Sequence, residues 1–151
     1  MDYLFIILGV FFYITDMIYM KGNYLCCKNV LETHSTLLAH HIINVFAQFG
    51  WMSNNKYILY LYLTTPLIVL LHWKTNNNKC ALTEYVNNQC NIKSGEYFRD
   101  MWFLIGVKKL KNYDSIQKGY LIVAWIITLV KVCLLYRSSA SHLSIDIYGG
   151  R

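Results

Sequence analysis

The chain has few charged residues and a single proline. Charged side chains make up 15% of its 151 residues, against about 25% in an ordinary soluble domain. Apolar residues make up 56%, and a soluble globule of this size could hardly bury so much apolar surface. The composition therefore predicts a single membrane domain over residues 1–151 rather than a soluble protein.

The chain also lacks the short motifs that identify common reactions and partners. It contains neither an H-E-x-x-H zinc motif nor a C-x-x-C pair. No basic and aromatic module of a known nucleic-acid-binding kind accompanies the net charge of +6. The basic residues lie mostly between apolar runs, where they anchor helices to anionic lipid. The expected partner is therefore the lipid bilayer and not nucleic acid, and no catalytic residue is assigned.

The first apolar run lacks the marks of a cleaved signal peptide. Such a peptide begins with a basic segment and ends at a small-residue cleavage site. Here the only early charge is Asp2, and no A-x-A pattern follows. The run is therefore expected to be a retained helix.

Four apolar runs are present, each at the short end of the length that crosses a hydrocarbon core of ~30 Å as a helix. They cover residues 3–20, 35–52, 57–73 and 119–136. Helices are expected rather than strands because backbone groups in lipid must be satisfied within their own segment. The predicted fold is an all-α, polytopic four-helix transmembrane bundle.

A shorter apolar run in the third loop predicts a helix lying in the membrane interface. The segment covers about residues 97–110, and its apolar part is followed by Lys108, Lys109 and Lys111. These lysines are expected to contact anionic lipid while the apolar side chains dip into the headgroup boundary. A helix that covers the end of the bundle is the alternative.

Lysine and arginine are unevenly distributed between the two sides of this arrangement. Residues 21–34 and 74–118 hold ten of them, the other side holds three, and Lys131 lies inside the fourth run. Because cytosolic loops are enriched in lysine and arginine, both termini are predicted to lie on the non-cytosolic side. Lys131 is expected to extend toward the nearer membrane surface.

Four of the five cysteines fall in the loops assigned to the cytosol, namely Cys26, Cys27, Cys80 and Cys90. Reduced thiols are expected on that side. The adjacent Cys26 and Cys27 also form a candidate palmitoylation site. With the inverted topology, Cys80 and Cys90 would become disulfide partners.

The second run carries a polar stripe. At about 100° per residue, four of its polar side chains fall within an arc of about 80°. The stripe consists of His34, His41, Asn44 and Gln48. Because lipid offers these groups no partners, the stripe is predicted to face the other helices.

Five side chains, one of them in the stripe, are candidate metal ligands near one end of the bundle: Asp16, His40, His41, His72 and Cys80. Carboxylate, imidazole and thiolate bind zinc, and two histidines from different helices could hold a haem. Hydrogen bonding between helices is the other interpretation of the same residues. Asp16 is expected to be hydrated, and no cofactor is assigned.

The loop after the third run reads HWKTNNNKCALTE, residues 72–84. His72 should end the helix, asparagines 76–78 should form a turn, and Thr83 should cap a short helix with Glu84 near its positive end. The H-x7-C-x-L-T-E pattern resembles a recurrent feature of small, uncharacterised integral membrane proteins, including ones from large DNA viruses. The resemblance also includes Asn76 and Leu82, covers residues 57–107, and implies four helices, an interfacial segment and no known activity.

The sequence favours a structural or assembly role. The protein would be a component of a virion's internal membrane that contacts coat proteins or other membrane proteins, with His72 and Cys80 as structural residues. A metal- or haem-binding membrane enzyme is one alternative. A small ion or proton carrier that uses Asp16 and His41 is another.

Overall fold

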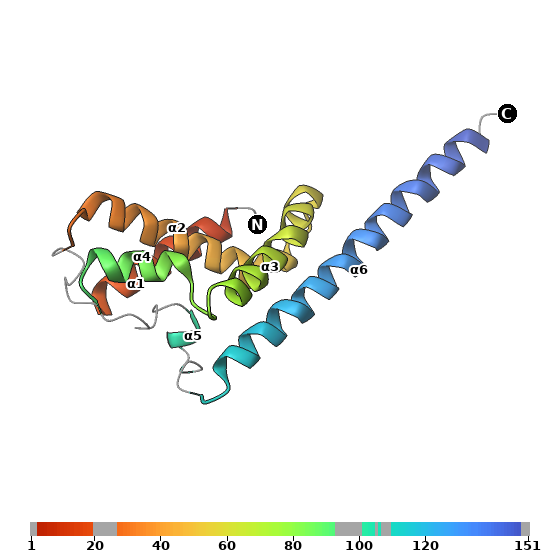
Figure 1. The fold of residues 1–151 in the computed structure, drawn as a ribbon. Coiled ribbons are helices and arrows are strands. Elements are labelled where there is room, and N and C mark those ends of the chain that lie inside the picture. The colour runs from red at the N-terminus through yellow and green to blue at the C-terminus, as the bar shows by residue number, and fades with distance from the viewer. Residues whose placement is uncertain (1–2, 20–26, 93–100, 105, 107–109, 149–151) are drawn as a thin grey trace.

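The computed structural model describes residues 3–19, 27–92, 101–104, 106 and 110–148, and this part of the chain is helical without strands (Figure 1). The elements are α1 (Leu4–Tyr19), α2 (Val30–Phe49), the short 3-10 helix η2 (Gly50–Met52), α3 (Lys56–Thr75), α4 (Ala81–Gln89), α5 (Met101–Leu104) and α6 (Tyr113–Tyr148). The prediction of an all-α fold is confirmed.

Two helices are long and apolar enough to cross a membrane, judged by length and composition: α3 and residues 113–137 of α6. Only 17% of the most apolar stretch of each is buried inside the protein, so most of their apolar side chains face outward. Helix α1 is apolar but only 16 residues long. Helix α2 is not among the candidates, because histidine and amide side chains interrupt it. The predicted set of four spans is therefore not confirmed.

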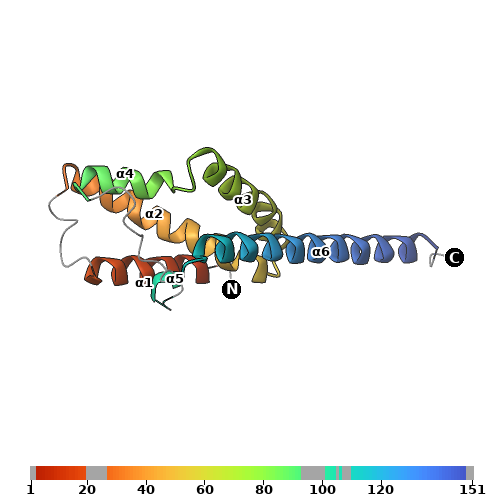
Figure 2. The same cartoon turned by 60° about the horizontal axis from the view of Figure 1, so that its bottom comes forward.

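The helices pack in two groups. Helix α2 lies between α1 and α4, while α3 packs mainly against α6 (Figure 2). The contacts between the groups run through η2 and the C-terminal half of α2. This arrangement does not confirm a four-helix bundle.

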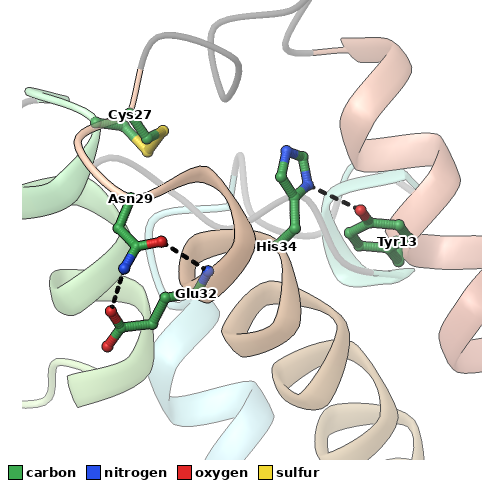
Figure 3. The surroundings of a disulfide bond; sticks show 6 residues. Tyr13, Cys27, Asn29, Glu32 and His34 are labelled. Atoms are coloured by element: carbon green, nitrogen blue, oxygen red, sulfur yellow. Dashed lines mark hydrogen bonds between the residues drawn. A yellow bond between two sulfur atoms is a disulfide. The ribbon is translucent and has the colours of Figure 1, made fainter.

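The predicted boundaries of two helices are wrong. Helix α2 begins at Val30 and not at residue 35, because Asn29 caps it: the Asn29 side chain accepts a hydrogen bond from the backbone N–H of Glu32 and donates one to its carboxylate (Figure 3). Helix α6 continues on both sides of the predicted 119–136 span and reaches 36 residues.

The contact between α1 and α2 depends on a glycine. A β-carbon at Gly9 would lie 2.8 Å from the Cα atom of Ile42, too close for any side chain. The two helices therefore approach closely at this point, as helices do where small residues face each other. Phe5, Phe12 and Val45 form the buried cluster beside it.

A disulfide joins Cys27, just before α2, to Cys90 at the end of α4. The expectation of reduced thiols is wrong at these two positions, and so is the alternative pairing of Cys80 with Cys90. Cys27 is also unavailable for palmitoylation, while Cys26 lies outside the described residues. Beside the disulfide, the Lys28 N–H donates to the Gln89 carbonyl at 3.0 Å, and the Tyr85 hydroxyl donates to Glu32.

Within the predicted interfacial segment, the structure shows the four-residue helix α5. The ring of Trp102 is buried against Tyr120 of α6, and the ring of Phe103 contacts Tyr19 of α1. These contacts favour the alternative prediction, in which this segment covers the end of the other helices, over a helix that lies in the membrane interface. Lys111 is exposed, and Lys108 and Lys109 lie outside the described residues.

Lys131 connects the middle of α6 to the turn between α2 and α3. Its ammonium group donates to the carbonyls of Trp51, at 3.1 Å, and Ser53, at 2.7 Å. The side chain extends toward this turn, and the carbonyls it reaches there supply the polar partners that a cation near lipid requires.

Candidate functional site

The loop between α3 and α4 is built around His72. The Asn76 N–H donates to the His72 carbonyl at 2.9 Å and ends α3. Asn77 and Asn78 then adopt positive φ angles of 51° and 60°, a conformation that asparagine tolerates better than most residues. The chain turns back so that the Ala81 N–H donates to His72 Nε2 at 3.0 Å. The predicted turn is confirmed, and the His72 side chain bonds to the backbone of the first residue of α4.

Cys80 occupies the position before the first residue of α4. It is the N-cap and makes no capping bond through its side chain, so the prediction of Thr83 as the cap is wrong by three residues. Glu84 lies in the first turn, as predicted, where a negative charge is favourable. Its carboxylate is 3.8 Å from the ammonium of Lys79.

The thiol of Cys80 lies 3.5 Å from Nε2 of His40, in the middle of α2. His40 is nearly buried and Cys80 is partly buried. The two residues are 40 positions apart in sequence, and the reversal of the chain at Asn76–Asn78 brings them together. The result is a thiol–imidazole pair within hydrogen-bonding distance.

A second pair lies on the other side of α2. Nε2 of His41 is 3.4 Å from a carboxylate oxygen of Asp16 on α1, and both side chains are almost completely buried. The expectation that Asp16 is hydrated is therefore wrong. Adjacent residues of a helix point about 100° apart, which explains why His40 and His41 contact different neighbours.

The five candidate ligands thus divide into separate contacts. Asp16 pairs with His41, Cys80 pairs with His40, and His72 accepts from the backbone. Within the described part of the chain, no group of three or more His, Cys, Asp or Glu side chains is placed to hold a metal ion.

The polar stripe of α2 also divides along its length. His34 Nδ1 lies 2.8 Å from the hydroxyl of Tyr13, so this end of the stripe, like His41, faces α1. Gln48 donates to Asn44 at 3.5 Å at the other end. Asn44 and Gln48 line a cavity.

This cavity has a volume of about 480 Å³ and lies between α2, α3, α4 and the start of α6. Most of its exposed wall is apolar. Its apolar lining residues are Ile43, Ala47, Ile68, Val69, Trp73, Ala81, Leu82 and Leu121. Its polar lining residues include His40, Asn44, Gln48, His72, Cys80, Thr83, Glu84, Asp114, Gln117 and Lys118.

On α3 and α6, the polar lining residues lie at the end of the cavity near the α3–α4 loop. Along α3, the apolar Ile68 and Val69 precede His72, and along α6 Leu121 follows Lys118. On both helices, the lining changes from polar to apolar within about one helical turn, counted from the end near the α3–α4 loop. The cavity therefore has a polar mouth near the α3–α4 turn and, apart from Asn44 and Gln48 of α2, an apolar interior.

Two polar atoms of the wall have no hydrogen-bond partner among the described residues: Oε1 of Gln48 and Oγ1 of Thr83. Gln48 is only 2% exposed. Buried polar atoms are almost always paired, so these two favour a ligand that hydrogen-bonds to the wall.

The contribution of α6 to the cavity was not predicted. Its lining residues Asp114, Gln117, Lys118 and Leu121 follow the i, i+3, i+4, i+7 spacing of one helix face. That spacing was available in the sequence, where residues 113–118 were instead assigned to a loop.

In comparisons with known proteins, no protein-family model, curated protein or solved structure matches the chain. The resemblance to small viral membrane proteins, the assembly role with coat proteins, and the ion or proton carrier therefore stay predictions.

Proposed function

We propose that this chain is a small multi-pass membrane protein that binds an amphiphilic molecule in the cavity between α2, α3, α4 and α6. The observation that carries the proposal is the polarity of the cavity, with imidazole, thiol, amide and charged groups at the mouth and an apolar interior. Its volume of about 480 Å³ falls within the usual ~300–1,000 Å³ of small-molecule sites.

The outer surface supports a membrane location for this cavity. Large apolar side chains are exposed along three helices, among them Ile7 and Phe11 of α1, Leu67 of α3, and Val123 and Val130 of α6. Exposure of such an apolar surface to water is unfavourable, whereas contact with lipid is not. An amphiphile could enter from the lipid with its apolar part first and leave its polar part at the mouth.

Binding of a fluorescent long-chain fatty acid to the detergent-solubilised protein tests the proposal. Val69→Trp places a large side chain in the wall of the cavity, and Leu67→Trp places the same side chain on the exposed face of α3, outside the cavity. We expect saturable one-to-one binding that Val69→Trp weakens about tenfold or more and Leu67→Trp leaves unchanged. Equal binding by both variants would contradict the proposal.

Two observations point in opposite directions on the sidedness of the protein. Lysine and arginine are concentrated in the loops near α4, which favours the cytosol for that side. The disulfide between Cys27 and Cys90 lies on the same side, and disulfides persist in oxidising compartments. We propose that α4 faces an oxidising compartment, because the disulfide is a direct contact of the folded chain, and that both termini face the other way.

Accessibility of α4 decides between these assignments. Asn88 is exposed on α4, so an Asn88→Cys variant provides a labelling site there. A membrane-impermeant maleimide should label it in sealed vesicles only from the non-cytosolic side, with the unaltered protein as the control for Cys80 and Cys133. Labelling only from the cytosolic side would restore the topology predicted from the charges.

A further inference from the structure

Cys80 and Cys133 are the free cysteines of the described residues, and their surroundings differ. Cys133 is exposed on the apolar surface of α6 and does not line the cavity. Cys80 lines the polar mouth, with its sulfur 3.5 Å from the imidazole of His40. A thiol held beside an imidazole is the arrangement that activates cysteine nucleophiles.

The cavity also offers groups that could position a carbonyl compound at this thiol. Gln48, buried and without a partner for its Oε1, and Thr83, with an unpartnered hydroxyl, lie in the same wall. Thr83 is three residues after Cys80 on the first turn of α4. Its hydroxyl can donate to the ester carbonyl oxygen of a substrate held at Cys80, whereas Gln48 lies about 12 Å further along α2 from His40 and lines another part of the cavity.

The depth of Cys80 indicates the class of substrate. The thiol lies beside the last turns of α3, where the N–H of the next residue, Ala81, donates to His72 and Trp73 follows, and tryptophan is enriched at the level of the lipid headgroups. The ester carbonyls of glycerolipids lie at this boundary between headgroup and acyl chain. The apolar interior of the cavity, with Ile68 and Val69, is suited to the attached acyl chain.

We propose that Cys80 is an acyl acceptor that attacks the ester of a membrane glycerolipid, with His40 as its general base. The inference rests on the proposed function, since the lipid is the amphiphile in the cavity. His40 takes the thiol proton as the sulfur attacks the ester carbonyl carbon. A carbon–sulfur bond forms, the ester carbon–oxygen bond breaks, and the leaving lysolipid alkoxide receives the proton from His40. The products are an acyl thioester on Cys80 and one lysolipid, without any change of oxidation state.

The test uses the full chain reconstituted in phosphatidylcholine vesicles whose acyl chains carry a terminal alkyne. After incubation, a clickable dye reports acyl chains attached to the protein, and mass spectrometry measures released lysolipid. We expect label on Cys80 that neutral hydroxylamine removes, as it does for thioesters, and one lysolipid for each labelled chain.

Three variants make this result specific. Cys80→Ala should reduce the label to background, and Cys133→Ala should keep the full label as the matched free-thiol control. His40→Gln should slow labelling by about 100-fold, the usual contribution of general base catalysis. In each variant, retained fatty-acid binding shows that the cavity is still folded.

The outcomes separate the two proposals. Fatty-acid binding without hydroxylamine-labile label on Cys80 would overturn the acyl-transfer inference and leave the binding function standing. Equal label on Cys80 and Cys133 would mark nonspecific acylation and would also overturn it. Absence of both binding and label would contradict both proposals.

Discussion

The two groups of helices are held together by different kinds of contact. Between α1, α2 and α4, side chains bond to side chains: Asp16 with His41, Tyr13 with His34, and Cys27 with Cys90. Around α6, side-chain donors instead reach mainly backbone carbonyls, although Trp51 donates to the Tyr120 hydroxyl and Lys118 donates to the Asn78 side chain. Trp125 Nε1 donates to the Leu63 carbonyl at 2.8 Å, and Lys131 donates to two carbonyls near η2.

This difference determines how much each group depends on individual residues. A side-chain pair requires both partners, and the loss of one leaves the other buried without compensation. A backbone carbonyl in a helix end or turn is present whatever the side chain, so such a contact depends on the donor alone. Substitutions in the first group should therefore destabilise the fold more than substitutions in the second.

The largest effect is expected from His41→Leu. The change leaves the carboxyl of Asp16 buried without its imidazole partner, and removal of one member of a buried pair typically costs about 3–5 kcal/mol. Thermal unfolding in detergent measures the loss. The double variant Asp16→Asn, His41→Leu should recover part of it, and a double variant no more stable than His41→Leu would contradict the pairing.

Removal of the disulfide should have the next largest effect. Cys27 and Cys90 are 63 residues apart in sequence, and a disulfide that closes such a loop contributes about 2–4 kcal/mol by restricting the unfolded chain. We expect the Cys27→Ser, Cys90→Ser variant to unfold at lower temperature than the oxidised protein. Reduction of the unaltered protein should produce a similar shift, and no shift in either case would show that the bond does not form.

Glycine substitutions compare the two groups directly. Gly9→Ala brings a β-carbon within 2.8 Å of the Ile42 backbone and should destabilise the protein by about 1–3 kcal/mol, as overpacking does. Gly119→Ala on α6 meets open space and should stabilise the helix by about 0.5–1 kcal/mol. Shifts of opposite sign in the unfolding midpoints of the two variants would confirm the prediction. Shifts of the same sign would contradict it.

The smallest effect concerns the bond between α4 and α2. The hydroxyl of Tyr85 donates to the carboxylate of Glu32, and this hydrogen bond raises the pKa of Tyr85 above its ordinary value of 10. Because the folded-state pKa is higher than the unfolded one, the stabilisation is complete below pH 10 and is lost as the pH rises through the folded-state pKa. The unaltered protein should be slightly more stable than Tyr85→Phe at pH 7, and the difference should disappear at strongly alkaline pH. A difference that persists there would exclude the hydrogen bond as its source.

The length of the apolar runs predicted the helices, and local residue chemistry predicted the turn after α3. The runs at residues 3–20 and 57–73 became α1 and α3 with small changes at their ends. The turn at Asn76–Asn78 also followed from nearby residues. Such features depend on interactions within a few residues of each other.

The remaining features depend on contacts between distant segments. The pairing of Cys27 with Cys90 cannot be read from cysteine positions alone, because several connectivities are possible. The candidate ligands were assigned to one end of a bundle because of their positions along the helices. In the structure, His40 and His41 contact different elements, α4 and α1. The position of a residue along its helix could be predicted from the sequence. The side of the helix on which its side chain finds a partner could not, because that depends on where α1 and α4 lie.

The length of α6 determines how far its C-terminal residues lie from the membrane-spanning part of the helix. Its 36 residues extend about 54 Å at 1.5 Å per residue, whereas a hydrocarbon core is about 30 Å thick. Residues 138–148 continue the helix past the 113–137 span, and Figure 1 shows this end standing apart from the other elements. With 113–137 in the bilayer, the last three turns act as a rigid spacer that holds residue 148 about 16 Å from the end of the span.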